Sequence, residues 1–278
     1  MRLYASPVSP LVMGILNVTP DSFFDGGRYF DHDAALRRGR EILDEGADVV
    51  DVGGESTRPG AHPVAEAEQL ARVLPVLEAL AEDDRVRAGT ARLSIDTTSP
   101  GVARAAVRAG ATIVNDVSCG LAAVAAETGA TYVAMHAKGT PETMQTAPQY
   151  DDVVGEVCAF LSDRAGAAEA AGVKEVWVDP GIGFGKTARH NLALLARLER
   201  IVSLGWPVLV GTSRKSFLGR LAAGGPEAAP RGVEERFEGS LATAAWSMAC
   251  GAAAVRVHDV KATVGAARLV LLASGGEG

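Results

Sequence analysis

Carboxylate and amide side chains end several of the apolar runs in this sequence. Asp96 ends "ARLSID", Asn115 and Asp116 end "ATIVND", and Asp179 follows "EVWV". Carboxylate oxygens accept hydrogen bonds from N–H donors, and an asparagine amide can both donate and accept. Asp96, Asn115 and Asp179 together suit the amidine-like edge of a heterocycle such as a 2-aminopyrimidinone. The alternative for each is that it caps the following helix, because Asp and Asn are common N-caps.

Cationic side chains follow the last two apolar runs. Lys215 lies in "TSRKS", directly after one run, and Arg256 and His258 alternate with valines in the other. Side chains two residues apart point to the same side of a strand. A helix that begins near Lys215 would add backbone N–H donors, so these residues predict an anion site. The alternatives are a buried polar network for Arg256 and His258 and a solvated basic turn for Lys215.

The segment "VDPGIGFGKTARHN" (178–191) resembles a phosphate-binding loop at first sight. The P-loop pattern requires a glycine five positions before Gly185, and Pro180 stands there instead. The pattern therefore fails. The glycines predict that the backbone leaves the strand in a tight turn, and Lys186 is expected to face solvent.

The apolar pattern shows which elements would bring these residues together. Eight short β-rich runs alternate with segments of helical spacing, such as 33–46 and 191–205. Continuous apolar strands separated by helices indicate a parallel sheet covered on both faces. Eight such units predict an α/β fold, a single-domain (β/α)8 TIM barrel, with a doubly wound open sheet as the alternative. The strands are expected at 11–18, 48–53, 91–96, 111–116, 131–136, 175–180, 207–212 and 253–259.

In a barrel, the carboxyl ends of all strands lie on one face, and active sites of this fold sit there. The polar strand ends therefore predict one site at the barrel mouth. The loops "NVTPDSFFDGGRYFD" (17–31) and "GGESTRPG" (53–60) leave from the same face. The first loop is a candidate lid over the site, although its aromatic residues could instead pack locally.

Composition limits the other possibilities. The net charge of −7 argues against a general nucleic-acid binder, and 47% hydrophobic residues suffice for a large core. Three widely spaced cysteines predict neither a disulfide framework nor a zinc site and fit a cytoplasmic setting. No signal peptide or membrane span is expected.

One domain is expected over 1–278, with a lead-in at 1–10, a mobile surface excursion at 221–235 and a flexible tail at 275–278.

Taken in order, the motifs resemble the dihydropteroate synthase family from about residue 11 to residue 270. The resemblance implies a barrel enzyme of folate synthesis that joins 6-hydroxymethyl-7,8-dihydropterin diphosphate to 4-aminobenzoate and releases diphosphate. It also implies Mg²⁺, a homodimer and inhibition by sulfonamides. The motifs are "GILNVTPDSFFDGG", "GADVVDVGGESTRPGA", "SIDT", "IVND", "AMHAKGTPETMQ", "WVDPGIGFGKT", "GTSRKSFLG" and "RVHDV".

The resemblance also assigns roles to single residues, and it implies Lys215, Arg256 and Asp96 as the catalytic ones. Two positions depart from the family pattern, Phe24 in the first loop and Ala137 after His136. Because Phe24 is adjacent to Phe23, the ring of either residue could cover the aminobenzoate. The pterin residues are Asp96, Asn115, Asp179, Lys215, Met135, Phe184 and Gly211. The diphosphate residues are Thr57, Asn17, Arg256 and His258, with Mg²⁺ on Asn17. The aminobenzoate residues are Ser213, Phe23, Arg58 and Pro59.

The chemistry favours a dissociative, SN1-like path. An aromatic amine is a weak nucleophile, whereas an electron-rich dihydropterin can stabilise a cation at its methylene carbon. Three rival functions remain open from the sequence. They are a corrinoid-type methyltetrahydrofolate methyltransferase, a Schiff-base aldolase with Lys215 as its nucleophile, and a non-catalytic pterin-binding protein.

Overall fold

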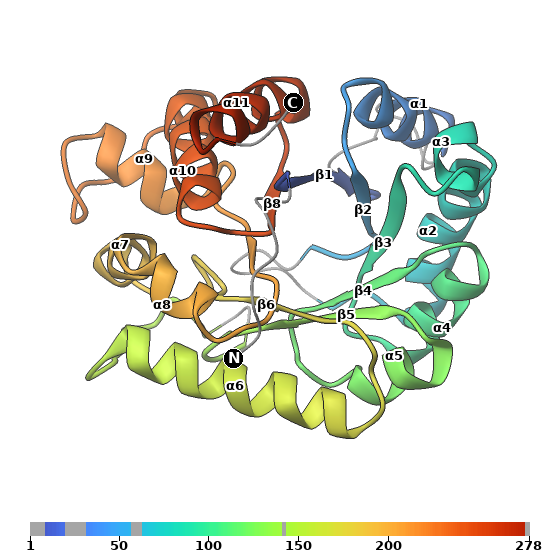
Figure 1. Ribbon diagram of the computed structural model, residues 1–278, viewed down its shortest axis with the longest axis horizontal. Helices are drawn as coiled ribbons and strands as arrows, with labels where there is room; N and C mark the ends of the chain where they lie inside the picture. The colour runs from blue at the N-terminus through green and yellow to red at the C-terminus, as the bar shows by residue number, and fades with distance from the viewer. Residues whose placement is uncertain (1–8, 20–31, 57–62, 141–142, 276–278) are drawn as a thin grey trace.

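The computed structural model describes residues 9–19, 32–56, 63–140 and 143–275. Eight parallel strands form the centre, and helices surround them (Figure 1). The strand order is β6-β5-β4-β3-β2-β1-β8-β7, and a parallel bridge between Val178 and Val208 joins the two ends of this sheet. The predicted single-domain (β/α)8 barrel is therefore confirmed, and the open sheet is excluded. The strands are β1 (Leu11–Asn17), β2 (Val49–Gly53), β3 (Arg92–Asp96), β4 (Ile113–Asp116), β5 (Thr131–Met135), β6 (Val176–Asp179), β7 (Leu209–Val210) and β8 (Ala254–Val257).

One or more helices follow each strand, in the expected alternation. The expected helix at 191–205 is two helices, because the backbone of Arg197 leaves helical geometry at φ −127° and ψ 29°. The helices are α1 (His32–Asp44), α2 (Glu66–Ala81), α3 (Asp84–Arg87), α4 (Pro100–Arg108), α5 (Ala122–Thr128), α6 (Val153–Ala170), α7 (Ala188–Ala196), α8 (Leu198–Val202), α9 (Ser216–Ala222), the 3₁₀ helix η1 (Val233–Arg236), α10 (Phe237–Ala249) and α11 (Val260–Ala273).

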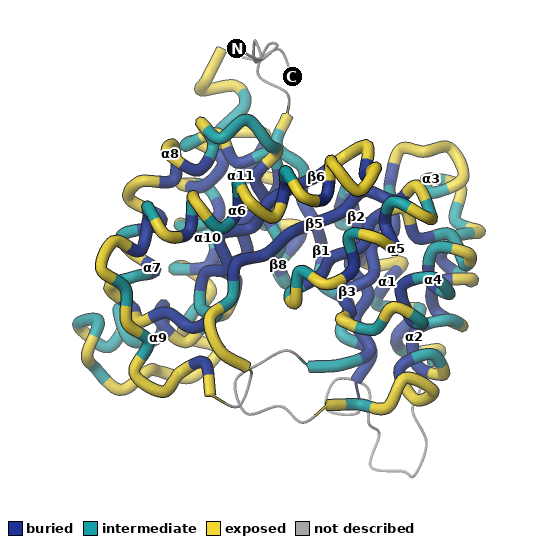
Figure 2. The backbone as a smooth tube through the Cα atoms, turned by 90° about the horizontal axis from the view of Figure 1, so that it is seen from below, coloured by how far each residue is buried: buried dark blue, intermediate teal, exposed yellow. Residues whose placement is uncertain are grey.

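The strands are buried on both faces, as their apolar sequences predict (Figure 2). One cluster of apolar side chains fills the space between the sheet and the helices. A second, smaller cluster fills the barrel interior and includes Met13, Val49, Ile113, Val133, Trp177, Leu209 and Ala254. Because strand side chains alternate, the next inward positions lie two residues further along each strand. Those positions are Ile15, Asp51, Asn115, Met135, Asp179, Gly211 and Arg256.

The barrel interior therefore has an apolar layer below and a layer above it, at the carboxyl ends of the strands, that contains most of the polar side chains. This layering explains why the polar side chains meet although they are far apart in sequence. The segment 221–235 lies at the surface, as expected, and nearly all of its residues are exposed or half-buried. The three cysteines are free. None of the helices in the part of the chain that the structure describes is long and apolar enough to span a membrane.

Candidate active site

A half-buried arginine organises the polar layer at the barrel mouth. The Nε of Arg256 on β8 donates to Asp51 Oδ2 on β2 over 2.6 Å, and its Nη2 donates to Asp96 Oδ2 on β3 over 2.7 Å. Asn115 on β4 donates from Nδ2 to the same Asp51 oxygen over 3.1 Å. Four strands thus contribute to one hydrogen-bonded network. The network joins the predicted pterin residues to the predicted diphosphate residue Arg256.

Two oxygens of this network are buried without a partner. Asp51 Oδ1 and Asp96 Oδ1 accept no hydrogen bond from the described residues. A buried acceptor left unsatisfied costs about 1–3 kcal/mol, and such atoms in a concave site are ready to receive ligand donors. Burial raises the pKa of Asp96, and the guanidinium of Arg256 opposes that rise. The Asp96 oxygen is therefore a candidate acceptor for an N–H donor of a ligand.

Asp179 lies at the end of β6 and faces the same mouth. Its Oδ1 accepts from the backbone N–H of Gly181 over 2.7 Å, which fixes the direction of the carboxylate. Burial raises the pKa of Asp179, and the positive charge of Lys215 opposes this.

None of the three residues predicted to bind the heterocycle caps a helix, so the alternative role of each as an N-cap is wrong. Ser99 caps α4 and Thr187 caps α7, each through its own side chain. The residue that satisfies the turn after β4 is Asp116, which accepts from the N–H groups of Ser118 and Leu121. Asp96, Asn115 and Asp179 therefore remain directed into the barrel.

Lys215 approaches the mouth from the start of α9. Its Nζ donates to the carbonyl oxygen of Ile182 and lies 4.7 Å from the centre of the Phe184 ring. Burial lowers the pKa of Lys215 to about 8, and the negative charge of Asp179 opposes this. Gly211 on the strand exit borders both cations, because a Cβ at that position would lie in ordinary contact, 3.7 Å from Arg256 Cβ and 3.9 Å from Lys215 Nζ. Met135 is buried at the end of β5.

The predicted anion residues lie on the side of β1, β7 and β8. Ser213 Oγ accepts from the backbone N–H of His258 over 3.1 Å and lies 3.0 Å from His258 Nδ1. Arg214 is turned away, because its guanidinium forms a two-point ion pair with Asp259. Asn17 ends β1 beside Gly53 of β2. Ser213 and His258 are therefore one hydrogen-bonded unit next to the strand that carries Arg256.

The expectation that Lys186 faces solvent is wrong. Only 2% of this residue is exposed, and its Nζ lies 2.8 Å from His136 Nδ1 and 2.9 Å from the carbonyl oxygen of Gly181. Burial lowers the pKa of Lys186 to about 7, and Asp179 opposes this. The long stem of Lys186 folds back under the glycine-rich loop because the loop presents carbonyl groups inward.

Sequence reasoning also missed Asp51. It lies in the middle of the apolar run "DVVDVG", so it did not count as a strand end. A charged residue that interrupts a buried strand is itself a signal, because an isolated charge is costly to bury without a partner. Asp51 is fully buried and its partner is Arg256.

Four predicted residues fall outside the described part of the chain. Thr57, Arg58 and Pro59 belong to the segment after β2, and Phe23 belongs to the segment after β1. Phe24, which departs from the family pattern, lies there too.

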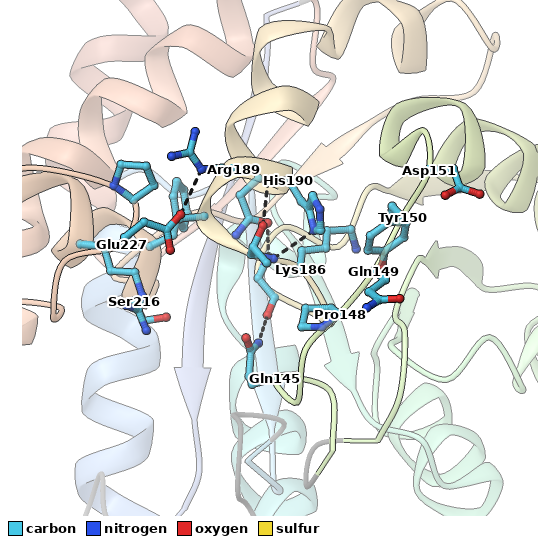
Figure 3. Close-up of a pocket in the computed structure, with 17 residues that line it drawn as sticks. Gln145, Pro148, Gln149, Tyr150, Asp151, Lys186, Arg189, His190, Ser216 and Glu227 are labelled. Carbon is cyan, nitrogen blue, oxygen red and sulfur yellow. Dashed lines mark hydrogen bonds and ion pairs between the residues drawn. The ribbon is translucent and has the colours of Figure 1, made fainter.

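A groove of about 630 Å³ adjoins the mouth on the side of α7 and α9 (Figure 3). Its lining is mostly polar and includes Gln145, Tyr150, Gly183, Lys186 and Ser216. Gly183 and Ser216 flank the Phe184–Lys215 contact in sequence. The groove therefore gives solvent access to the outer side of the loop that borders the mouth.

No group of three or more His, Cys, Asp or Glu side chains with metal-binding geometry occurs among the residues described. Mg²⁺ does not require such a group, since it commonly keeps waters and takes one or two protein oxygens together with substrate phosphates. The amide oxygen of Asn17 is a donor of the type that Mg²⁺ accepts, at the strand end next to the anion residues. The residues present therefore fit a substrate-borne Mg²⁺.

Comparison with known proteins agrees with this geometry. Residues 13–258 match the family described as pterin binding enzyme. The dihydropteroate synthase of Escherichia coli K12 is 45% identical over 97% of this chain and 95% of that protein. The Mycobacterium leprae dihydropteroate synthase is 47% identical over 93% of this chain and 92% of that protein.

Solved structures give the same result. A Xanthomonas albilineans dihydropteroate synthase with 4-aminobenzoic acid has a TM-score of 0.86 and 43% identity, covering 98% of this chain and 96% of that one. A second structure from that organism, in complex with 7,8-dihydropteroate, has a TM-score of 0.83 and 40% identity, covering 98% and 97%. These relatives favour synthase chemistry over the methyltransferase, aldolase and non-catalytic alternatives.

Proposed function

The chain belongs to the dihydropteroate synthase family of pterin binding enzymes, and from this premise we propose which of its residues carry each part of the reaction. The enzyme is a transferase of folate synthesis that makes 7,8-dihydropteroate. The observation that carries the proposal is the network of Arg256 with Asp51 and Asp96, extended by Asn115. This network places hydrogen-bond acceptors for a heterocycle at the same barrel mouth as a cation for an anionic leaving group.

The pterin is proposed to lie between the carboxylates and Lys215. Asp96 Oδ1 and the free side of Asp179 would accept its ring N–H and amino donors, while Asn115 completes the edge. Met135 and Phe184 supply apolar walls, and Gly211 leaves space for the ring. Lys215, positioned over Phe184, would donate to a ring acceptor. Sulfonamide inhibition is expected at the neighbouring aminobenzoate slot.

The diphosphate is proposed to lie beside Arg256 and His258. Two nitrogens of Arg256 are held by carboxylates, and its Nη1 makes no hydrogen bond within the described residues, so it can reach a phosphate oxygen. Asn17 and Thr57 are proposed to complete this side, and Asn17 would hold Mg²⁺. When bound, Mg²⁺ neutralises charge on the diphosphate. Ser213, Phe23, Arg58 and Pro59 are proposed to form the aminobenzoate slot.

We propose that the displacement is SN1-like. The bond between the methylene carbon and the diphosphate oxygen breaks first, and the electron pair leaves with diphosphate. The lone pair of the aminobenzoate nitrogen then forms the C–N bond, and the amine loses its proton afterwards. Asp96 and Asp179 would stabilise the cationic pterin, while Arg256 and His258 stabilise the departing anion. Preorganised charges of this kind often supply the largest part of catalysis.

We further propose that the enzyme is a cytoplasmic homodimer. The free cysteines suit a reducing compartment. Exposed apolar side chains on the last two helices, Trp246, Leu269 and Leu272, are 52%, 69% and 59% exposed and suit a subunit interface.

An assay of product formation tests the proposed roles. Incorporation of labelled 4-aminobenzoate into dihydropteroate should require the pterin diphosphate and the wild-type chain. Lys215→Ala should lower the rate by about 10²- to 10³-fold, as expected for loss of one preorganised donor. The exposed Lys174→Ala is the matched control and should keep the wild-type rate. Equal rates for Lys215→Ala and Lys174→Ala would contradict the assignment.

A further inference from the structure

The glycine-rich loop between β6 and α7 is held by side chains at five successive carbonyl groups. Gly181, Gly183 and Gly185 all have positive φ, so the backbone of this loop reverses direction repeatedly. Each of the five carbonyl oxygens from 181 to 185 accepts a hydrogen bond from a side chain. The donors are Lys186 to Gly181 (2.9 Å), Lys215 to Ile182, Gln145 to Gly183 (2.7 Å), Lys186 to Phe184 (3.0 Å) and Tyr150 to Gly185 (2.9 Å).

Lys186 is the centre of this arrangement (Figure 3). Besides the two loop carbonyls, its Nζ lies 2.8 Å from Nδ1 and 3.2 Å from the carbonyl oxygen of His136, which follows β5. An ammonium has three hydrogens and no acceptor, so four acceptors around it leave none of its hydrogens unused. Burial lowers the pKa of His136 to about 3, so His136 is neutral and its Nδ1 can accept. Lys186 therefore ties the loop after β6 to the strand end of β5.

The loop carries two features of the proposed pterin site. Phe184 supplies the ring that faces Lys215, and the carbonyl of Ile182 receives the Lys215 ammonium. Both features are fixed by the backbone of the loop and not by their own packing alone. A small rotation of the peptide units would move the ring and redirect Lys215 together. The loop also has no room to retreat, because a Cβ at Gly181 would overlap the carbonyl oxygen of His136.

We infer that Lys186 is a positioning residue for the pterin half of the active site, and that Tyr150 and Gln145 assist it. It acts through the peptide units of residues 181–185 and does not itself contact substrate. This inference rests on the proposed placement of the pterin against Phe184 and Lys215. It gives a function to a buried cation that the reaction does not otherwise use.

Substitution of Lys186 by Met tests the inference, because Met keeps the length of the stem and removes all three donors. The KM for the pterin diphosphate should rise by about 10- to 100-fold, as expected when contacts that hold the substrate equally in the ground state and the transition state are weakened. The KM for 4-aminobenzoate at saturating pterin diphosphate and kcat should each change by less than about threefold, because loss of such uniform binding changes only the KM of the substrate concerned. Lys174→Met, at an exposed lysine, is the matched control and should leave every constant and Tm unchanged.

The split between KM and kcat separates positioning from a purely structural role. If Lys186 merely supported the fold, Lys186→Met would lower Tm and the fraction of active enzyme, so that kcat would fall while the pterin KM stayed the same. That result, or a pterin KM within twofold of wild type, overturns the inference.

Two single-donor variants keep the test decisive if Lys186→Met does not fold. Tyr150→Phe and Gln145→Leu each release one loop carbonyl, and each should raise the pterin KM by about threefold without lowering kcat. An unchanged pterin KM in both contradicts the inference. Phe184→Ala separates an error in the proposed placement of the pterin from an error in the proposed role of Lys186. If Phe184→Ala also leaves the pterin KM unchanged, then the placement of the pterin is wrong; if it raises the KM while the other three variants do not, only the role of Lys186 is wrong.

Discussion

At the scale of single residues, the site depends on Arg256, which forms ion pairs with two carboxylates at once. Its guanidinium bridges Asp51 and Asp96, so one cation stabilises two buried carboxylates. Burial alone would favour the protonated, neutral form of a carboxylic acid. The guanidinium keeps acceptor oxygens available at a depth where water is scarce. In the proposed mechanism, little reorganisation of charge is then needed when the leaving group departs.

Removal of Asp51 should disturb both binding and stability. Asp51→Ala takes away the buried acceptor of Arg256 Nε and of Asn115 Nδ2, and it leaves the half-buried guanidinium with one partner fewer. Breaking a buried pair from one side costs about 3–5 kcal/mol in the free energy of unfolding. Urea denaturation should show a loss of this size. The exposed Asp163→Ala should change the free energy of unfolding by less than about 0.5 kcal/mol.

Loss of the positive charge on Lys215 should slow the reaction at alkaline pH. Burial lowers the pKa of Lys215 to about 8, so the ammonium is present below this pH and is lost as pH rises through it. The kcat/KM for the pterin diphosphate should therefore fall above about pH 8. Lys215→Arg replaces the ammonium with a guanidinium that stays charged, so the fall should disappear even if the absolute rate is lower. If kcat/KM of Lys215→Arg also falls above about pH 8, a group other than Lys215 causes the fall.

At the scale of elements, period-two alternation places the site. Most of the contributing strands place an apolar residue in the lower layer and a functional residue two positions later, as in Ile113 and Asn115, or Trp177 and Asp179, whereas β3 has Ser94 two positions before Asp96. This alternation, together with the strand count, made the barrel and the convergence of the polar strand ends on one mouth predictable from the sequence. The alternation also explains Asp51, which lies two residues after Val49.

Other features could not be read from the chain. The direction of Lys186 depends on carbonyl groups supplied by a loop and by His136, fifty residues earlier. A solvent-facing lysine and a buried lysine have the same local sequence pattern. The pairing of Arg256 with Asp51 joins the last strand to the second, so it follows only from closure of the barrel. The break between α7 and α8 likewise has no clear signal in the apolar spacing.

The loop after β6 should tolerate no side chain at Gly181. Gly181 and Gly205 both have positive φ, but a Cβ at Gly205 meets nothing within 4 Å, whereas one at Gly181 would overlap the carbonyl of His136. Gly205→Ala should cost about 1–2 kcal/mol from the backbone conformation alone. Gly181→Ala should cost a further ~1–3 kcal/mol from overpacking. Urea denaturation of the two variants measures the difference, and equal losses would show that the loop can retreat from β5.

At the scale of the whole molecule, the proposed homodimer predicts where the surface is sensitive. Leu269 and Leu272 lie on α11, one helical turn apart, and both are more than half exposed. The double variant Leu269→Glu, Leu272→Glu should sediment as a monomer of 28.7 kDa, while the wild type sediments at twice that mass. Arg108→Glu on α4 introduces a glutamate on a different helix and should leave the mass unchanged. A wild-type chain that sediments as a monomer would contradict the proposal.

The central claim is that carboxylates from separate strands of one barrel hold a single heterocycle. Calorimetric titration with 6-hydroxymethylpterin measures this directly for the wild type, Asp96→Asn and Asp179→Asn, with the exposed Asp163→Asn as control. Loss of one charged acceptor corresponds to about 1.5–3 kcal/mol, so each of the two site variants should bind about 10- to 100-fold more weakly, and the control should bind as the wild type does. Wild-type affinity in both site variants would mean that the pterin lies elsewhere.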